Sequence, residues 1–406
     1  MTAEVLSEQS LAPFIQLIPS VKRSRFWRPI GLSRLPEPLT RPRVAFYPKA
    51  RNAIWHALNA LRLSPEQNIL MPAYHCGSDL DAVLKSGTQV KFYRIDRTAQ
   101  IDVEHLRQTI DKRTKALFLI HYFGFPQRDL PALLQLCRDH GLYLIEDCAH
   151  SLYSTLSDGR MLGTFGDLAV FSLWKTLPLP EGGATLINNQ ALIVKQPNRS
   201  RPLYDRVRDA RYRVANLMVG RYGAIGKGVQ QVAIDPLAAA VKRIAGRHSS
   251  VQAGNGGSAN RQQINPHVTF DVNTADLRMS SWAGYLLGHF DHQRIRETRR
   301  RNYEFLSAAF SGIPNLRPLF PSLYDGVCPL CFPVVVEEAA SLQDYLRSRK
   351  IITQRFWDEF HGCSPTDGFP DAAFLNAHIV AFPIHQDLTV EALQRMAEAT
   401  LQYASQ

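Results

Sequence analysis

The stretch of sequence that decides the fold is ALFLIHYFGFPQRDLPALLQLCRDHGLYLIEDCAH, residues 116–150. It begins with an apolar run, 116–120, and continues with an amphipathic segment, 130–140, that stops at Gly141. A second apolar run, 142–145, follows at once. A buried strand, a helix and another buried strand are typical of a parallel sheet that is covered by helices on both faces.

The same alternation extends to both sides of this stretch. Upstream, short apolar strands are expected at 68–71 and 90–95, each separated from the next strand by a helical segment. Downstream, two more strands are expected at 168–171 and 184–187. The sequence therefore predicts an α/β fold with a mainly parallel central sheet flanked by helices. Ligands in such sheets bind at the carboxyl ends of the strands, so the residues that follow the strands are the candidate site residues.

Changes in composition divide the chain into three parts. Residues 1–44 are rich in proline and arginine and are expected to form an extended arm. Residues 45–290 are expected to form the large α/β domain, interrupted by a basic and partly flexible insertion at about 197–268. Residues 291–406 are expected to form a smaller α+β domain. One long helix is expected from 280 through 310, across the junction of the two domains.

The composition excludes several classes of protein. The chain has 406 residues, of which 45% are hydrophobic and 20% charged, as in ordinary globular proteins. No stretch reaches the roughly 18 consecutive apolar residues of a membrane span. Six cysteines in a chain of this length form no dense disulfide framework. We therefore expect a cytoplasmic globular protein, not a fibrous, disulfide-stapled or membrane-spanning one.

Positive charge is concentrated in one segment. The formal net charge is +11, and eleven basic residues against three acidic ones lie between 199 and 247. Because the rest of the chain is nearly neutral, binding to nucleic acid is not expected. The basic insertion is either a solvated amphipathic helix or a segment that docks on an acidic surface or on lipid headgroups, which would bring the protein to a membrane surface.

An acid and a lysine follow two of the expected strands. Asp147 comes just after the apolar run at 142–145, and Lys175 follows the run at 168–171. This pairing suggests pyridoxal phosphate, because a lysine amine forms a Schiff base with its aldehyde while a carboxylate keeps its ring nitrogen protonated. The phosphate would need a helix N-terminus, and residues 49–53 could supply one, with Ser172 as a second contact.

An ordered series of motifs resembles the DegT/DnrJ/EryC1/StrS-type sugar aminotransferases, which have the pyridoxal-phosphate fold type I. The resemblance runs from about 46 to 190 and resumes from about 273 to the end of the chain. The matching segments are 72–76, 120–126, 145–150, 163–167, 171–175, 181–183, 278–280 and 382–389.

The resemblance implies a role for each candidate residue. Lys175 would bond to the cofactor and carry the proton, and Asp147 would bind the pyridine nitrogen. His150 would lie near the ring hydroxyl, and Ser172 would bind the phosphate. Further cofactor contacts are expected from Arg51, Asn52, Tyr74 and Cys76, and substrate contacts from His121 and Arg278.

The resemblance also implies an activity. Members of this family usually transfer an amino group from glutamate to a keto sugar carried on a nucleotide, in the biosynthesis of polysaccharides or natural products. They are usually homodimers with the active site at the subunit interface. No metal is expected, because Cys328 and Cys331 have no second pair and are expected to be buried thiols on a strand.

Three residues depart from the family pattern. Arg51 stands where a threonine would bind the phosphate, and Cys76 stands where an aromatic side chain would stack on the ring. Asp276 replaces an asparagine that reaches the phosphate of the neighbouring subunit. An acid there would repel the phosphate, so either Arg51 compensates or that contact is absent.

These departures leave two alternatives open. One is a different reaction of the same cofactor, a sugar dehydration, although loss of the lysine would favour it and Lys175 is present. The other is a cofactor-poor homologue that acts as a binding or regulatory subunit. His121 likewise has two interpretations, a core histidine or a residue close to the pocket.

Overall fold

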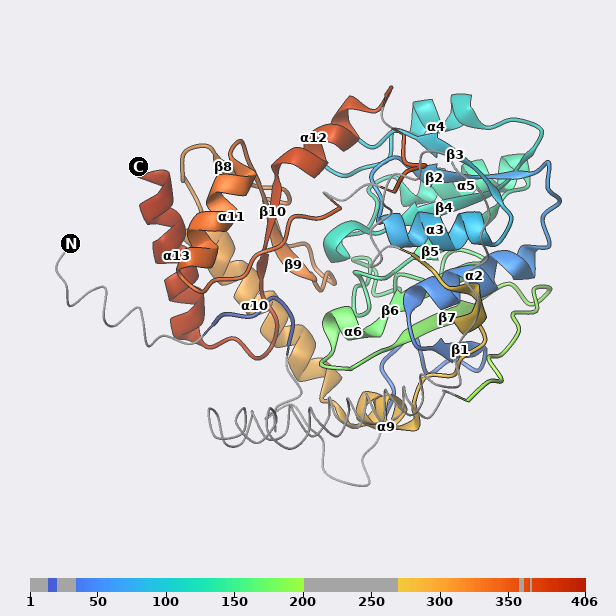
Figure 1. The fold of residues 1–406 in the computed structure, drawn as a ribbon, viewed down its shortest axis with the longest axis horizontal. Coiled ribbons are helices and arrows are strands. Elements are labelled where there is room, and N and C mark those ends of the chain that lie inside the picture. The colour runs from blue at the N-terminus through green and yellow to red at the C-terminus, as the bar shows by residue number, and fades with distance from the viewer. Residues whose placement is uncertain (1–13, 20–33, 201–268, 358–360, 366) are drawn as a thin grey trace, which may run out of the picture.

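The chain folds into two lobes that lie side by side (Figure 1). The larger lobe is built on a seven-stranded sheet and the smaller on a three-stranded sheet. This computed structural model describes residues 14–19, 34–200, 269–357, 361–365 and 367–406. Most of the expected amino-terminal arm and most of the basic insertion lie outside the described residues, so both stay predictions.

The large sheet has the strand order β1-β7-β6-β5-β4-β2-β3. Its five strands from β3 to β6 pair in parallel, whereas β7 runs antiparallel to both β6 and β1. The mainly parallel sheet predicted from the sequence is therefore confirmed. The strands are β1 (Val44–Tyr47), β2 (Asn68–Pro72), β3 (Gln89–Tyr93), β4 (Thr114–Ile120), β5 (Tyr143–Asp147), β6 (Leu168–Ser172) and β7 (Gly183–Ile187).

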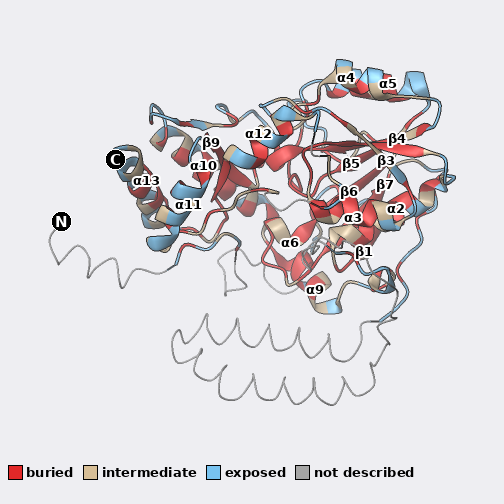
Figure 2. Cartoon of the chain, turned by 45° about the horizontal axis from the view of Figure 1, so that its top comes forward, coloured by how far each residue is buried: buried red, intermediate tan, exposed pale blue. Residues whose placement is uncertain are grey.

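Helices cover both faces of this sheet, which explains why its central strands are apolar throughout. Helices α2 (Ala50–Leu61) and α3 (Gly77–Lys85) pack together on one face, and α4 (Val103–Thr109) and α5 (Leu130–His140) cover the other. Figure 2 shows the strands as a buried layer between them. Helix α5 has the bounds expected from the sequence, and its last turn closes at Gly141 in a left-handed conformation.

The smaller lobe is an antiparallel sheet with helices packed on it. Its strands β8 (Leu316–Pro318), β9 (Cys331–Val336) and β10 (Ile379–Pro383) have the order β10-β9-β8. Its helices are α10 (His292–Ala309), α11 (Ala339–Ser348), α12 (Pro370–His378) and α13 (Val390–Ala404). These elements all fall within the expected domain at 291–406, although the domain boundaries themselves stay predictions.

The single long helix expected at 280–310 is wrong. Two helices occupy this region, α9 (Ser281–His289) and α10, with Phe290 and Asp291 between them. The Asp291 carboxylate accepts a hydrogen bond from the backbone N–H of Arg294 at 3.3 Å and so caps the start of α10. Because an aspartate before the first turn satisfies the free N–H groups of a helix start, α10 begins here as a new helix and does not continue α9.

Among the described residues, no helix has both the length and the apolar character that a membrane crossing requires.

The lobes meet at the carboxyl edge of the large sheet, directly after β4. The Ser154 hydroxyl accepts a hydrogen bond from the Cys328 N–H at 2.9 Å, and the Leu330 N–H donates to the Phe123 carbonyl at 2.8 Å. Gly124 has φ +101°, and a Cβ atom there would lie 2.6 Å from the carbonyl oxygen of Cys328. Only glycine allows the two backbones to approach this closely.

We expect Gly124→Ala to lower the free energy of unfolding by about 2–4 kcal/mol, since it adds backbone strain and overpacks a rigid contact. Gly159→Ala is the matched control, because Gly159 also has a positive φ, +85°, but open space around its Cα. Urea denaturation of both variants measures the difference. If both variants lost the same free energy of unfolding, the close contact between the lobes at Gly124 would add nothing beyond the backbone strain.

Candidate active site

Four candidate residues gather at the carboxyl edge of the large sheet. Asp147 is the last residue of β5, Ser172 is the last residue of β6, and Tyr74 follows β2. Lys175 lies on α6 (Leu173–Thr176), the short helix that starts directly after β6. Figure 1 places α6 on the side of the large lobe that faces α10 of the smaller lobe. The site is therefore assembled where the two lobes adjoin.

Two glycines let the chain double back beside the lysine helix. Gly182 donates its N–H to the Pro48 carbonyl at 2.8 Å and accepts from the Leu173 N–H at 2.9 Å. A Cβ atom on Gly183 would lie 2.3 Å from the carbonyl group of Lys49, just before α2 begins. The start of α2 and the start of α6 are thus held against one backbone segment. This brings the expected phosphate-binding helix close to Lys175.

Lys175 contacts His150 directly. The Lys175 Nζ lies 3.0 Å from the His150 Nε2. The other ring nitrogen, Nδ1, accepts a hydrogen bond from the backbone N–H of Phe123 at 3.3 Å. Burial, and secondarily the charge of Lys175, hold the pKa of His150 well below its usual value of 6.5. A neutral imidazole donates at one ring nitrogen and accepts at the other, so the charged Lys175 amine donates to Nε2, and Nε2 can carry the proton only when the amine no longer donates to it.

The Asp147 carboxyl is buried with little to compensate its charge. Its Oδ1 accepts one hydrogen bond, from the backbone N–H of Ala149 at 2.8 Å. Burial, and secondarily the negative charge of Asp79, raise the pKa of Asp147 from 3.8 to about 7, against the charge of Lys175. A protonated ring nitrogen would provide the missing positive partner. In this respect the site fits pyridoxal phosphate.

The phosphate side of the site has one cation and one buried hydroxyl. Arg51 lies in the first turn of α2, and its Nη1 donates to the Thr269 carbonyl at 2.8 Å. The Ser172 side chain is 2% exposed and does not cap α6, the helix it precedes. Asn52 instead donates from Nδ2 to the Thr274 carbonyl at 2.8 Å, so it holds the 274–275 loop against α2.

Asp276 is neutralised within its own chain. Its Oδ2 lies 3.1 Å from the Lys195 Nζ, and its Oδ1 lies 3.4 Å from the Nε2 of the buried His56. Lys195 is therefore the cation that pairs with Asp276, and the two alternatives for the phosphate, compensation by Arg51 or absence of the contact, stay predictions. Since the carboxylate pairs with Lys195, the acid at this position carries less repulsion toward a phosphate than its type suggests.

The two expected substrate residues lie in different surroundings. The His121 ring is fully buried, with its Nε2 3.0 Å from a Glu146 carboxylate oxygen and its Nδ1 accepting from the Gln127 N–H at 3.4 Å. Arg278 is exposed, and its Nε donates to the Pro197 carbonyl at 3.1 Å. His121 has the contacts of a core histidine, and a substrate role for either residue stays a prediction.

Glu146 has a structural task beside His121. Its two carboxylate oxygens accept hydrogen bonds from the backbone N–H groups of Gly163, Phe165 and Gly166 at 3.0, 2.7 and 2.6 Å. With Cys148, this histidine and glutamate form a buried group whose ligand atoms lie within 4.8 Å of one another, as in a metal site. The hydrogen bonds already occupy the carboxylate, so the group is explained by the loop that it holds.

The structure adds two residues that the sequence analysis missed. Asp79, in the first turn of α3, is a buried carboxyl close enough to influence Asp147, Lys175 and Arg51 electrostatically. Trp357 reaches the site from the smaller lobe, with its ring centroid 5.7 Å from that of His150. The only early signal for Asp79 was its position three residues after Cys76, one helical turn along α3.

Comparison with known proteins agrees with the motifs. Residues 49–220 match the model of the DegT/DnrJ/EryC1/StrS aminotransferase family. GDP-perosamine synthase of Vibrio cholerae is 34% identical over 146 residues, which is 35% of this chain and 39% of that protein. UDP-N-acetyl-3-dehydro-alpha-D-glucosamine 3-aminotransferase of Acidithiobacillus ferrooxidans is 32% identical over 133 residues, 32% of this chain and 36% of the relative. These matches span about two fifths of the relatives' length.

Solved structures extend the likeness to nearly the whole chain. Helicobacter pylori PseC, an aminotransferase involved in the biosynthesis of pseudoaminic acid, has a TM-score of 0.66 at 16% identity and covers 97% of this chain and 100% of its own. The Streptococcus pneumoniae sugar aminotransferase Spr1654, solved in its PLP form, has a TM-score of 0.64 at 16% identity, with 97% and 98% covered. The expected family resemblance and fold class are thereby confirmed.

The charge of Asp147 yields a prediction for the cofactor-free protein. Because the pKa of Asp147 is raised to about 7 in the fold, ionising it costs stability as the pH rises from about 4 to 7, and the loss persists above that. At about 1.4 kcal/mol per pH unit, the full cost is roughly 4 kcal/mol. Asp147→Asn should therefore raise the free energy of unfolding at pH 8 and change little at pH 4.

Urea denaturation at the two pH values, with pyridoxal phosphate absent, measures this difference. Asp167→Asn is a useful control, since the Asp167 carboxylate accepts hydrogen bonds from the Leu144 N–H at 2.8 Å and from the Asn189 side chain at 2.7 Å. We expect that variant to gain nothing at pH 8. If the free energy of unfolding at pH 8 rose in Asp167→Asn but not in Asp147→Asn, then Asp147 would not be the carboxyl whose ionisation destabilises the fold.

Proposed function

We propose that this protein is a pyridoxal-phosphate-dependent aminotransferase that transfers an amino group, with glutamate as donor, to a keto sugar linked to a nucleotide. The observation that carries the proposal is the joint placement of the Lys175 amine, the His150 imidazole and the buried Asp147 carboxyl at one edge of a fold-type-I sheet. The relatives supply the substrate class, since they include a GDP-sugar, a UDP-sugar and a dTDP-sugar enzyme.

Each residue has a task in this proposal. Bound at this edge, pyridoxal phosphate supplies a ring that withdraws electrons from the carbon that loses or gains the amino group. Asp147 binds the ring nitrogen and keeps its proton in place. His150 donates from Nε2 to the ring hydroxyl. Lys175 would hold the cofactor through its Nζ, and as a free amine the same Nζ would move the proton at the reacting carbon.

The phosphate of the cofactor is assigned to Ser172 and Arg51. The Ser172 hydroxyl is buried at the end of β6, and the Arg51 guanidinium opens α2, where the N–H groups of the helix also favour an anion. Arg51 replaces a hydroxyl by a charged group that can bind phosphate through two N–H donors. The two-step exchange balances, because glutamate becomes 2-oxoglutarate as the keto sugar becomes an amino sugar.

The wider setting belongs to the same proposal. We place the enzyme in the cytoplasm, as a homodimer whose active site lies at the subunit interface, acting in polysaccharide or natural-product biosynthesis. A relative whose name states a role of this kind is the spore coat polysaccharide biosynthesis protein SpsC of Bacillus subtilis, 32% identical over 146 residues.

Cofactor binding is tested by colour and by chemical trapping. We expect the purified protein, incubated with pyridoxal phosphate, to turn yellow, and borohydride to remove the visible band and leave the reduced cofactor on Lys175, as found by peptide mass spectrometry. Lys175→Ala should bind no cofactor covalently, whereas Lys195→Ala should be labelled like the unchanged protein. A protein that stays colourless with excess cofactor would support the alternative of a binding or regulatory subunit.

The reaction is tested by a screen of nucleotide keto sugars. With glutamate and the correct sugar, the protein should form 2-oxoglutarate and the amino sugar in equal amounts. Lys175→Ala should reduce the rate by at least about a thousandfold, because the group that moves the proton is lost. Release of water from the sugar without consumption of glutamate would identify a dehydratase instead.

A further inference from the structure

An indole from the smaller lobe lies among the aromatic rings that close the site. The Trp357 ring centroid is 4.5 Å from that of Tyr74, 5.7 Å from Tyr122, 6.4 Å from Phe123 and 5.7 Å from His150. These four partners follow β2, β4 and β5 of the large sheet. Trp357 therefore contacts three strand ends at once, across the boundary between the lobes.

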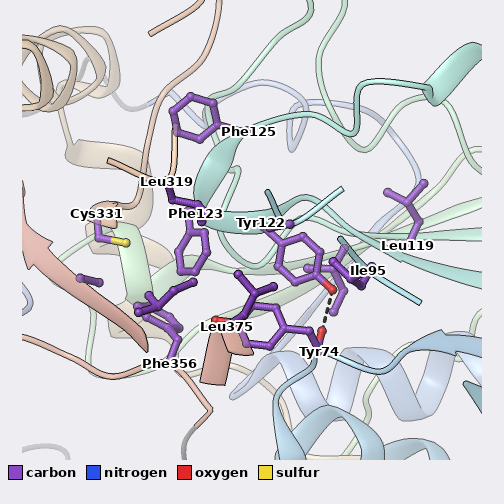
Figure 3. Close-up of a cluster of buried hydrophobic side chains, with 14 of the residues drawn as sticks. Tyr74, Ile95, Leu119, Tyr122, Phe123, Phe125, Leu319, Cys331, Phe356 and Leu375 are labelled. Carbon is purple, nitrogen blue, oxygen red and sulfur yellow. Dashed lines mark hydrogen bonds between the residues drawn. The ribbon is translucent and has the colours of Figure 1, made fainter. Parts of the chain in front are cut away.

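The rings around His150 fix the plane of its imidazole. Trp357 lies at 15° and Phe123 at 27° to that plane, both nearly parallel to it. Phe356 meets the imidazole edge-on, at 74° with the centroids 5.3 Å apart. Stacked and edge-to-face pairs at these separations are favourable arrangements. Figure 3 shows Phe123 and Phe356 beside one another, with Tyr122 and Tyr74 joined by a hydrogen bond.

The backbone of Trp357 is strained. Its φ is +62°, a left-handed value that is rare for a bulky side chain. Such a conformation persists only where the surrounding structure imposes it, and it is often found at functional sites.

Residues on both sides of Trp357 are held by contacts to the two lobes. Before it, Gln354 exchanges backbone hydrogen bonds of 3.1 and 2.8 Å with Ala381 of β10. After it, the His361 Nε2 lies 3.3 Å from the Asp81 carboxylate, and the Ser364 hydroxyl lies 3.4 Å from the His75 Nε2. The segment is thus tied to the small sheet at one end and to the α3 region of the large lobe at the other.

We infer that Trp357 is a positioning residue for His150, which it holds with Nε2 directed at the Lys175 Nζ. The inference deepens the proposed function, because its importance rests on Lys175 being the catalytic amine. Among the described residues, His150 is the only side chain that makes a hydrogen bond with Lys175, so a rotation of the imidazole would remove it. The smaller lobe, through one indole, then determines the environment of the amine on the larger lobe.

The test is a double-mutant cycle read out on Lys175 itself. The full chain, freed of cofactor, is treated with trinitrobenzenesulfonate, and the rate of Lys175 labelling is followed by peptide mass spectrometry. We expect Trp357→Leu to change this labelling rate about threefold to tenfold, which corresponds to the free energy of one aromatic pair. In a His150→Ala background the same substitution should change it little, since its effect passes through the imidazole.

Two controls accompany the cycle. Trp282→Leu removes an indole that stacks on Tyr285 of α9, outside the site, and should leave Lys175 labelling unchanged. Trp357→Phe keeps an aromatic face and should restore most of the original rate, and it replaces the leucine variant in the cycle if that variant does not fold.

The outcomes separate the inference from the proposed function. Equal effects of Trp357→Leu with and without His150 would mean that the indole only shields the amine, and no effect in either background would exclude any role; both results overturn the inference. Because the labelling of Lys175 uses no cofactor, its result does not depend on borohydride trapping. If trapping failed but the effect of Trp357→Leu still required His150, the proposed function alone would be overturned.

Discussion

The proposed site depends on a carboxyl that the protein buries and leaves mostly uncompensated. Asp147 accepts a single short hydrogen bond and lies near a second buried acid, Asp79, with Lys175 as the opposing charge. A fold retains such an expensive group when a ligand supplies the missing partner. The rest of the fold offsets the free-energy cost of this burial, because an apolar sheet, covered on both faces, holds the carboxyl at a fixed strand end.

The second constraint is that no single lobe contains the site. The amine is on α6 of the larger lobe, but the rings that surround its histidine partner include Phe356 and Trp357 from the smaller one. Arg299 of α10 adds another link, since its buried guanidinium donates to the Thr176 carbonyl at 3.0 Å and to the Leu330 carbonyl at 2.9 Å. The residue next to the lysine is therefore fixed by a helix more than a hundred positions away. Relative movement of the lobes would alter the chemistry directly.

Sequence reasoning located what is local and missed what is distant. Short local patterns in the sequence were enough to predict the strands and the bounds of α5. The same patterns gave the spacing of Asp147, His150 and Lys175. They did not give the partner of Asp276, because Lys195 lies 81 positions earlier and meets it only after the chain folds. Trp357 was missed for the same reason. The division of the expected long helix depended on one capping side chain, Asp291, whose hydrogen bond no periodicity encodes.

The direction of β7 has a consequence for the molecule as a scaffold. Because this strand runs against β6, its first residue, Gly183, joins the carboxyl ends of the parallel strands at the same rim. All the chemistry thus occupies one rim, and the turns on the opposite one, such as those at Gly87 and Gly141, have open space around them. That far rim is free to vary: insertions, affinity tags or new chain termini placed there would leave the amine and its carboxyl undisturbed.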